Sequence, residues 1–389
     1  MTEPRTPSVA ASPSEPSARA QRESAQTAED KIFVASQGQL MWWRFRKHKP
    51  AIVGGIIVIL VYLVALFCEF LAPYDPVKYD QKDTYAPPQR IRIVDQGKVQ
   101  SPFVYGLTQS RDPVSYRMMF QVDQGKKYPV RFFVRGSAYK MWGLFEGDLH
   151  LFGIDDPEGS IHLLGADRMG RDVFSRLVYG ARVSMSIGLV GVILSFVLGI
   201  TIGGFSGYYG GALDTVVQRI IEFIRSVPSI PLWMALSAAL PVDWPPTKIY
   251  FGITVVLSLI GWTWLARVVR SQFLSIREED YVMAARLSGT GEVRIIYRHM
   301  VPAFMSYIIA QMSLSIPNMI LSETSLSFLG LGIRAPAISW GVLLQEAQNL
   351  RAVALAPWLL APGLAVVLIV LAFNFLGDGL RDAADPYSR

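Results

Sequence analysis

Residues 277–302 read REEDYVMAARLSGTGEVRIIYRHMVP, a polar segment between two apolar stretches of the chain. Its pattern predicts a short helix over 277–287, then a sharp turn at Gly289, because glycine accepts a positive φ, and then a second helical segment. Small side chains at Ala284 and Ala285 would let a partner's groove close over the helix backbone. We therefore expect this segment to dock a soluble partner, with an ordinary loop between helices as the alternative.

Composition sets the class of protein around this segment. The 389 residues are 51% hydrophobic and only 17% charged, with a mean hydropathy of +0.31, which is typical of an integral membrane protein. The net charge is +6, but the basic residues flank apolar stretches and form no stripe with interleaved aromatics, so we expect no nucleic-acid partner. The single cysteine, Cys68, lies in an apolar run and can form neither an internal disulfide nor a cysteine-based metal site.

Six apolar stretches are candidate membrane spans. Five are uncharged and have roughly 18 residues or more, enough for a helix to cross ~30 Å of hydrocarbon. The sixth, residues 227–242, is shorter and contains three prolines, so it is either a kinked span or a re-entrant segment. We favour a span, because the number of crossings then places residues 277–302 on the inner side. The predicted spans are about 51–68, 183–208, 227–242, 249–266, 301–322 and 352–377.

The short basic flanks predict the orientation. Residues 267–298 carry six Arg against four acidic residues, whereas residues 241–248 carry a single Lys. Because Lys and Arg accumulate in cytoplasmic loops, both termini are expected in the cytoplasm and residues 73–182 outside. The Ser-, Pro-, Ala- and Glu-rich residues 1–38 are expected to form a disordered cytoplasmic tail, and residues 379–389 a second, short cytoplasmic tail.

Two segments beside spans predict interfacial helices. Residues 39–72 combine the first span with an aromatic and basic stretch at 40–45, whose rings would lie at headgroup depth; a plain stop before the span is the alternative. Residues 161–182 alternate acids with Arg and space four apolar side chains into one stripe, which predicts an amphipathic helix leading into the second span. Glu323, near the end of a span, is expected at the interface rather than on a translocation path.

Residues 73–160 are long enough for a small extracytoplasmic domain. YPVRFFVR at 128–135 and residues 91–94 have the β-branched and aromatic content of strands, and glycines separate them as turns. We therefore expect a small β-containing insertion after the first span. It would act either as a contact surface for a solute-binding protein or as a rigid cap without a direct role.

Motifs for catalysis are missing from the sequence. There is no GxxxxGK[ST] nucleotide loop, HExxH zinc helix or nucleophile elbow, and the four histidines are scattered, so we expect no catalytic residue, cofactor or metal site in this chain. Gly199, Gly203 and Gly207 repeat every four residues, which allows helix backbones to approach closely and predicts helix packing. A membrane protein with these properties is most simply the pore subunit of a machine that other subunits power.

The polar segment also carries a resemblance to a known family. Its residues 281–302 resemble the cytoplasmic loop of binding-protein-dependent ABC transporter permeases, whose pattern is EAA, three residues, Gly, nine residues, Ile, one residue and Leu-Pro. Met283 stands in the acidic position and His299 in the isoleucine position; Asp280 or Glu279 would then supply the acid. The resemblance implies ATPase docking by Asp280, Tyr281, Met283, Ala284, Ala285, Arg286, Gly289, His299 and Pro302.

Three further stretches, 162–182, 323–332 and 374–386, are similar to permeases of the oligopeptide, dipeptide and nickel branch, of the C-subunit kind. The resemblance implies the type-I ABC importer permease fold, all-α with six transmembrane helices, in a bacterial inner membrane. The implied partners are a second homologous permease subunit, two ATPase subunits that hold ATP and Mg, and an extracytoplasmic solute-binding protein. The cargo stays open among peptides, nickel, opines and oligosaccharides.

Two other classes of function compete with this one. A secondary transporter or channel working without ATPases would be expected to bury polar clusters within its spans and to need no structured cytoplasmic loop. A membrane-anchored receptor that uses residues 73–160 would leave five further spans unexplained. The pattern of this chain favours the permease.

Overall fold

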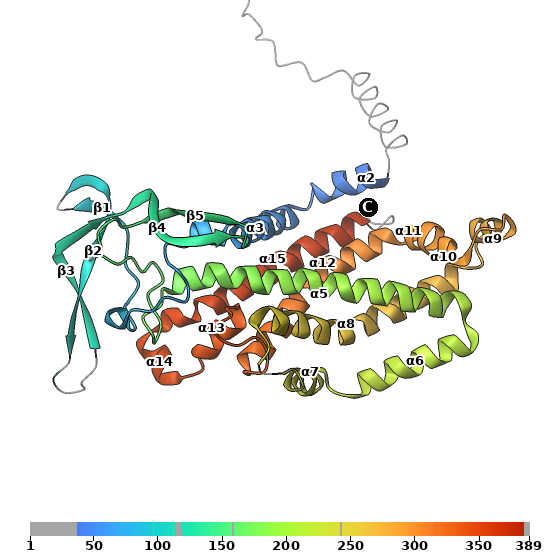
Figure 1. The fold of residues 1–389 in the computed structure, drawn as a ribbon. Coiled ribbons are helices and arrows are strands. Elements are labelled where there is room, and N and C mark those ends of the chain that lie inside the picture. The colour runs from blue at the N-terminus through green and yellow to red at the C-terminus, as the bar shows by residue number, and fades with distance from the viewer. Residues whose placement is uncertain are drawn as a thin grey trace, which may run out of the picture.

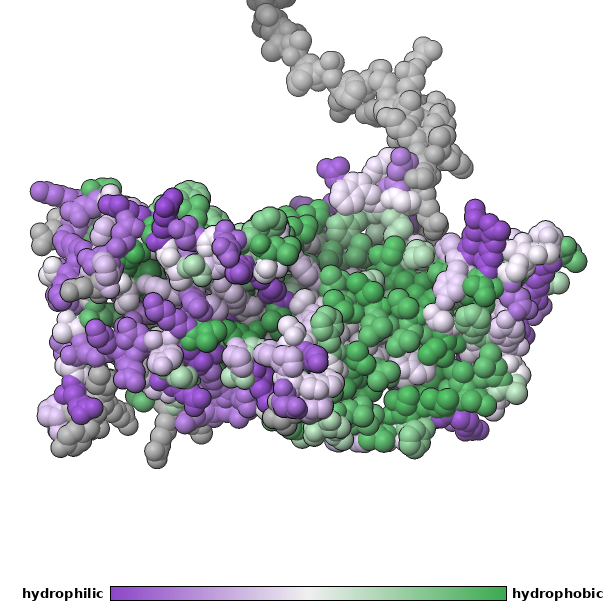
Figure 2. Space-filling model, viewed as in Figure 1, coloured by the Kyte–Doolittle hydropathy of each residue, from purple (hydrophilic) through white to green (hydrophobic). Residues whose placement is uncertain are grey.

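A computed structural model describes residues 37–95, 97–111, 113, 118–157, 159–241 and 243–384. Of the expected tails, residues 1–36 and 385–389 lie outside the described residues, whereas residues 37–38 and 379–384 are helical. Figure 1 shows a bundle of long helices with the β-strands at one end and the short helix α9 at the other. On the face that Figure 2 shows, an apolar belt covers the bundle, and more polar surface lies at both ends. The β-strands and α9 thus lie on opposite sides of the belt.

Four helical segments of the described chain are long and apolar enough to cross a membrane, or six if each of two bent helix pairs counts as one span. The four are α3 (Lys49–Leu66), α5 (Val173–Tyr209), α8 (Pro246–Ile276) and α15 (Ala361–Ala384) together with the 3-10 turn η3 (Pro357–Leu360) that precedes it. The bent pairs are α6 (Gly211–Ser226) with α7 (Ser229–Ala238), and Glu292–Ala303 with α12 (Met305–Phe328). Short helices α2 (Gln37–Phe45), α4 (Cys68–Leu71), α13 (Trp340–Glu346) and α14 (Leu350–Leu355) complete the helical part.

The third span differs from the prediction for residues 227–242. The helix there, α7, has only 10 residues, which is about 15 Å of helix and too short to cross the bilayer alone. A 90° bend separates it from α6, because Pro228 holds an extended backbone just before α7 begins. The chain can complete a crossing here only as the pair α6 and α7, so the predicted bounds are wrong.

The amphipathic helix expected at 161–182 is wrong in its first half. Residues 161–172 contain no helix, and α5 begins at Val173 as one continuous 37-residue helix. The Asp172 carboxylate accepts a hydrogen bond from the Ser175 N–H at 2.7 Å and so caps the helix. Upstream, the Asp167 carboxylate accepts hydrogen bonds from the backbone N–H groups of Met169 and Arg171. These bonds fold this stretch into a turn.

The last two spans also begin later than predicted. Pro302 lies in the three-residue helix α11 (Val301–Ala303), and α12 restarts beyond Phe304 after a bend of 76°. Pro302 therefore stands before the bend and not in the first turn of the span. The stretch predicted as a span from residue 352 starts with the separate helix α14, and α15 then continues to Ala384, past the predicted end at 377.

The insertion between α3 and α5 is β-rich, as predicted. Strands β1 (Arg92–Asp95), β2 (Lys98–Arg111) and β3 (Met118–Pro129) form an antiparallel sheet, and β4 (Arg131–Met141) and β5 (Phe145–Gly153) form a separate hairpin. The predicted strand at 128–135 is divided, since Val130 separates the end of β3 from the start of β4. A small apolar core of Val104, Tyr128, Val130, Phe152 and Ile161 holds these strands together.

Close packing of α5 on α8 forms the centre of the bundle. All three glycines of the repeat lie on this contact. A Cβ added to Gly203 would lie 2.4 Å from the Ala266 carbonyl oxygen, and one on Gly207 would lie 2.7 Å from the Phe273 Cβ. A Cβ on Gly199 would lie 2.9 Å from a Leu265 side-chain atom. The absence of side chains on α5 thus allows the two helix backbones to approach closely.

Candidate docking site and translocation face

The polar segment at residues 277–302 contains a short helix followed by a turn at a glycine. Helix α9 (Asp280–Leu287) ends where the Ser288 N–H donates to the Ala284 carbonyl at 3.0 Å and the Thr290 N–H donates to the Ala285 carbonyl at 3.1 Å. Gly289 follows with φ +76°, the left-handed conformation that ends many helices. The predicted turn at Gly289 is confirmed, and so is the helix, although it begins at Asp280 and not at the predicted residue 277.

The two alanines of the EAA-type pattern face opposite ways. Ala285 is only 8% exposed and packs inward beside Val282, which belongs to the main apolar core of the bundle. Ala284 is exposed, as are Tyr281 and Met283. The outer face of α9 therefore leaves Ala284 exposed, while Ala285 packs the helix against its own chain.

Leu287 is a docking candidate that sequence reasoning missed. Its side chain is 86% exposed at the end of α9, more than any other large hydrophobic side chain among the described residues. Asp280, Arg286, Gly289 and Pro302 are also exposed, whereas His299 is half-buried. The available signal was a large apolar residue directly after Ala284, Ala285 and Arg286.

Contacts on its inner side attach α9 firmly to the bundle. The Arg286 guanidinium lies over the ring of Tyr208 near the end of α5, 4.8 Å from the ring centroid. Beyond the turn, α10 (Glu292–Arg294) and the π-helical turn η2 (Ile295–Met300) bury Ile295, Ile296 and Met300. The exposed residues Gly291, Glu292, Val293, Arg294, Tyr297, Arg298 and Pro302 line an open groove beside them. These contacts connect α9 to α5 and, through η2 and α11, to the segment that leads into α12.

One face of α12 carries a row of polar side chains within the apolar belt. Gln311, Ser315, Asn318, Ser322 and Ser325 follow one another at intervals of three or four residues, the spacing of a single helix face, and none of them is fully buried. Polar groups on one face of a membrane helix are typical of a surface that lines a water-filled path or meets another subunit. The sequence prediction did not identify this row, although its spacing is visible in the printed sequence.

Glu323 lies on the same helix, α12, but on its buried side. It is 0% exposed, and it accepts hydrogen bonds from the Ser184 hydroxyl at 3.2 Å and the Ser327 hydroxyl at 2.8 Å. Ser184 in turn accepts the Trp340 N–H at 3.1 Å, so the cluster joins α5, α12 and α13. Glu323 thus lies in the protein interior and is not on an exposed face, while its interfacial depth stays a prediction.

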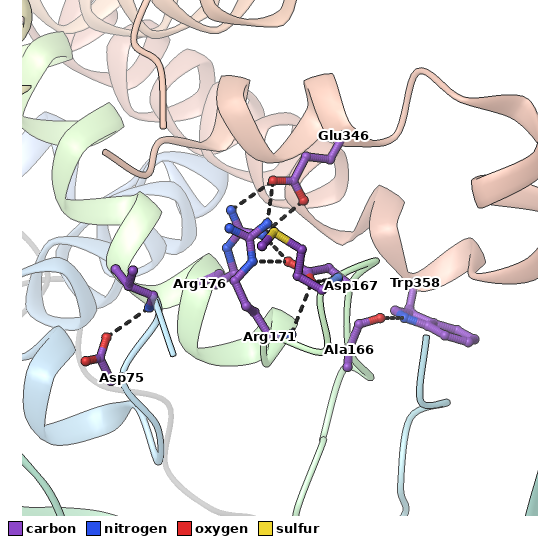
Figure 3. A network of polar contacts seen from close by, with 9 residues as sticks. Asp75, Ala166, Asp167, Arg171, Arg176, Glu346 and Trp358 are labelled. Atoms are coloured by element: carbon purple, nitrogen blue, oxygen red, sulfur yellow. Dashed lines mark hydrogen bonds and ion pairs between the residues drawn. The ribbon is translucent and has the colours of Figure 1, made fainter. Parts of the chain in front are cut away.

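A buried ionic cluster holds the β end of the bundle together (Figure 3). The Arg176 guanidinium contacts both Asp167 and Glu346, and Arg171 donates to Asp167 at 2.7 Å and to Glu346 at 2.8 Å. Trp358 adds a bond from its indole N–H to the carbonyl of Ala166 at 2.9 Å. The cluster joins the turn before α5, α5 itself and α13. Its acids pair with both Arg side chains, and only the buried Nε–H of Arg176 has no partner among the described residues.

Beside this cluster, His162 lies between two carboxylates. Its Nδ1 is 3.0 Å from Asp172 and its Nε2 is 3.0 Å from Asp83. Burial alone lowers the pKa of His162, but the bonds to Asp172 and Asp83 outweigh it and raise the pKa to about 9. At neutral pH the imidazolium therefore joins the segment before β1 to the start of α5.

Two family models match the chain. Residues 199–389 match the binding-protein-dependent transport system inner membrane component, and residues 36–88 match the N-terminal TM domain of oligopeptide transport permease C. These two matches leave residues 89–198, which include the β insertion, uncovered. The matched regions contain α9, the α12 face and the glycine repeat.

Curated relatives agree with the family models. The dipeptide transport system permease protein DppC of Bacillus subtilis is 39% identical over 235 residues, which cover 60% of this chain and 71% of that protein. The oligopeptide transport system permease protein OppC of the same organism is 36% identical over 241 residues, which cover 62% and 76%. An inward-facing structure of the MetNI methionine ABC transporter aligns at 18% identity with a TM-score of 0.44, over 55% of this chain and 97% of that one.

The two family models and the curated relatives agree with the helical membrane core that the structure shows. The predicted type-I importer permease fold and the predicted permease function are thereby confirmed. The chain belongs to the family of binding-protein-dependent transport permeases, the multi-pass inner-membrane components of ABC transporters.

Proposed function

We propose that this chain forms one half of the translocation path of an ATP-driven importer of peptides and seats α9 on an ATPase subunit. The observation that carries the proposal is α9 itself, a helix fixed to the bundle through Val282 and Ala285 that still exposes Ala284 and Leu287 outward. Such a helix suits insertion into a groove of a partner. The full assembly would contain a second homologous permease subunit, two ATPase subunits that hold ATP and Mg, and an extracytoplasmic solute-binding protein.

The two ends of the apolar belt support a proposed orientation. The α9 end, rich in Arg, would be cytoplasmic and the β insertion extracytoplasmic. His48 before α3 and Asp382 near the end of α15 lie 3.9 Å apart, which supports placing the two termini on the same side, the cytoplasm. The insertion would then face the solute-binding protein.

The mechanism that suits this arrangement is alternating access. Closure of the two ATPases on ATP would move the seated α9 helices as rigid bodies, and the attached bundles would rock between inward- and outward-facing states. The α12 face would line the path. Gln311 and Asn318 carry amide groups that both donate and accept hydrogen bonds, as peptide groups do, which supports a peptide as cargo. The names of the relatives, dipeptide and oligopeptide permeases, point the same way.

A matched pair of substitutions tests the docking. Leu287→Asp places a charge on the outer end of α9, and Val99→Asp makes the same kind of change at a side chain of similar exposure, 79%, in the β insertion. We expect L287D to lower the yield of co-purified ATPase subunits and ATP-dependent uptake at least tenfold, with normal amounts of the chain in the membrane. V99D should retain the ATPases. Normal ATPase recovery with L287D would refute the assignment of α9.

A further inference from the structure

The tip of the β4–β5 hairpin lies against the outer end of the first span. The Trp142 indole N–H donates to the Leu66 carbonyl, the last residue of α3, at 2.8 Å, and the Trp142 backbone N–H donates to the Glu69 carboxylate at 3.2 Å. The rings of Trp142 and Phe67 lie 6.2 Å apart between centroids. The hairpin therefore points back toward the apolar belt, beside α3, as Figure 1 shows.

The side chains at this tip are large, apolar and exposed. Leu144 is 76% exposed, and Trp142 and Phe145 are also exposed. Gly143, with φ +72°, makes the tight turn that places these side chains together. An exposed cluster of this kind is unfavourable in water and marks a surface that something apolar covers. We call residues 141–145 the hairpin tip.

The neighbouring helix α3 indicates what covers the hairpin tip. Helix α3 carries no charge after Lys49. Its outward side chains, among them Ile59, Leu63 and Leu66, are exposed and belong to the apolar belt. The tip continues that surface at the outer end of α3, because Trp142 bonds to Leu66 itself. Figure 2 shows hydrophobic patches beside α3 on an otherwise hydrophilic β end. A membrane that covers α3 would also reach the tip.

Charged groups beside the tip agree with a position at the membrane surface. Lys140 and Glu146 flank it as an exposed ion pair at 3.1 Å, and Arg182 bonds to Glu69 just beyond the end of α3. Tryptophan and other aromatic side chains with charged neighbours are typical of the headgroup region of a bilayer. The apolar tip and its charged flanks thus match the boundary between acyl chains and headgroups.

We propose that the hairpin tip inserts into the outer-leaflet interface of the membrane, so that Trp142, Leu144 and Phe145 contact lipid. The insertion is then held at two places, by its chain connections to α3 and α5 and by this lipid contact. Sheet β1–β3 becomes a platform with a fixed tilt above the membrane. This inference goes beyond the proposed function and does not depend on the identity of the cargo or on ATPase docking.

Spin labels measure the predicted depth. Leu144→Cys is labelled with a nitroxide in the full-length chain, purified with its co-expressed partner subunits and reconstituted in vesicles of phosphatidylethanolamine and phosphatidylglycerol. Cys68, the chain's own cysteine, is buried, so the wild-type chain provides the unlabelled blank. Leu63→Cys on α3 is the control within lipid, and Val99→Cys in β2 is the control in water. Collision rates with oxygen and with a water-soluble nickel chelate are compared.

We expect the label at 144 to resemble the label at 63, with collisions favouring oxygen and with nickel-chelate collisions at least fivefold fewer than at 99. Nickel-chelate collisions at 144 equal to those at 99 would overturn the proposal, because the tip would lie in water. An immobilised label at 144 that is shielded from both reagents would overturn it as well, because a protein partner would then cover the tip.

Discussion

The turn after α9 depends on a backbone conformation that only glycine adopts easily. Gly289 has φ +76°, and among the described residues no atom lies within 4 Å of the position that a Cβ would occupy. Gly289→Val therefore introduces backbone strain without a steric clash. An L-residue in this conformation costs about 1–2 kcal/mol, and a β-branched residue lies at the upper end of that range. About 1.4 kcal/mol corresponds to a tenfold increase in the population in which the turn is open.

Hydrogen exchange, followed by mass spectrometry, measures the population in which the turn after α9 is open. The N–H groups of Ser288, Gly289 and Thr290 close the turn on carbonyl groups of α9, and they should exchange roughly tenfold faster in G289V. Gly291→Val is the matched control, because Gly291 has φ −60° and equally open surroundings among the described residues. G291V should exchange as the wild type does, and G289N should fall between the two. Equal exchange in G289V and G291V would refute the reasoning.

Three further changes test other parts of the account. Gly203→Val places side-chain atoms against the Ala266 backbone and should destabilise the bundle by about 1–3 kcal/mol, seen as a lower Tm, whereas Gly55→Val, whose nearest neighbour lies 3.5 Å away, should not. His162, with its pKa raised to about 9, contributes on the order of 3 kcal/mol below pH 6.5, which is lost as pH rises through 9; proteolysis of the insertion should accelerate in that window. Asn318→Leu should lower peptide uptake about fivefold at unchanged Tm.

Local signals in the sequence were enough for the docking segment and for most of the spans. Gly289 indicated the turn because few other residues accept its φ, and the small residues before it indicated the helix. Uncharged stretches of roughly 18 residues located α3, α5 and α8 because the thickness of a bilayer sets the length of a span. The β-branched and aromatic residues around 128–135 likewise indicated strands.

Tertiary contacts decided what the sequence could not. The inward direction of Ala285 depends on its packing beside Val282 and the core, and the burial of Glu323 depends on serines of α5 and α12. In the sequence pattern, Asp172 was one charge of a predicted amphipathic helix. In the structure, its carboxylate accepts a hydrogen bond from the Ser175 N–H and caps α5. Such contacts join residues whose distances in space a single sequence does not reveal.

The central claim, that α9 seats on an ATPase, is tested most directly by a photo-crosslinking amino acid at position 287, where the wild-type side chain is 86% exposed. Irradiation of intact membranes that contain the whole assembly should join the chain covalently to a nucleotide-binding subunit, and the same group at position 99 should not. Absence of that adduct at 287, in an assembly that still transports, would contradict the account.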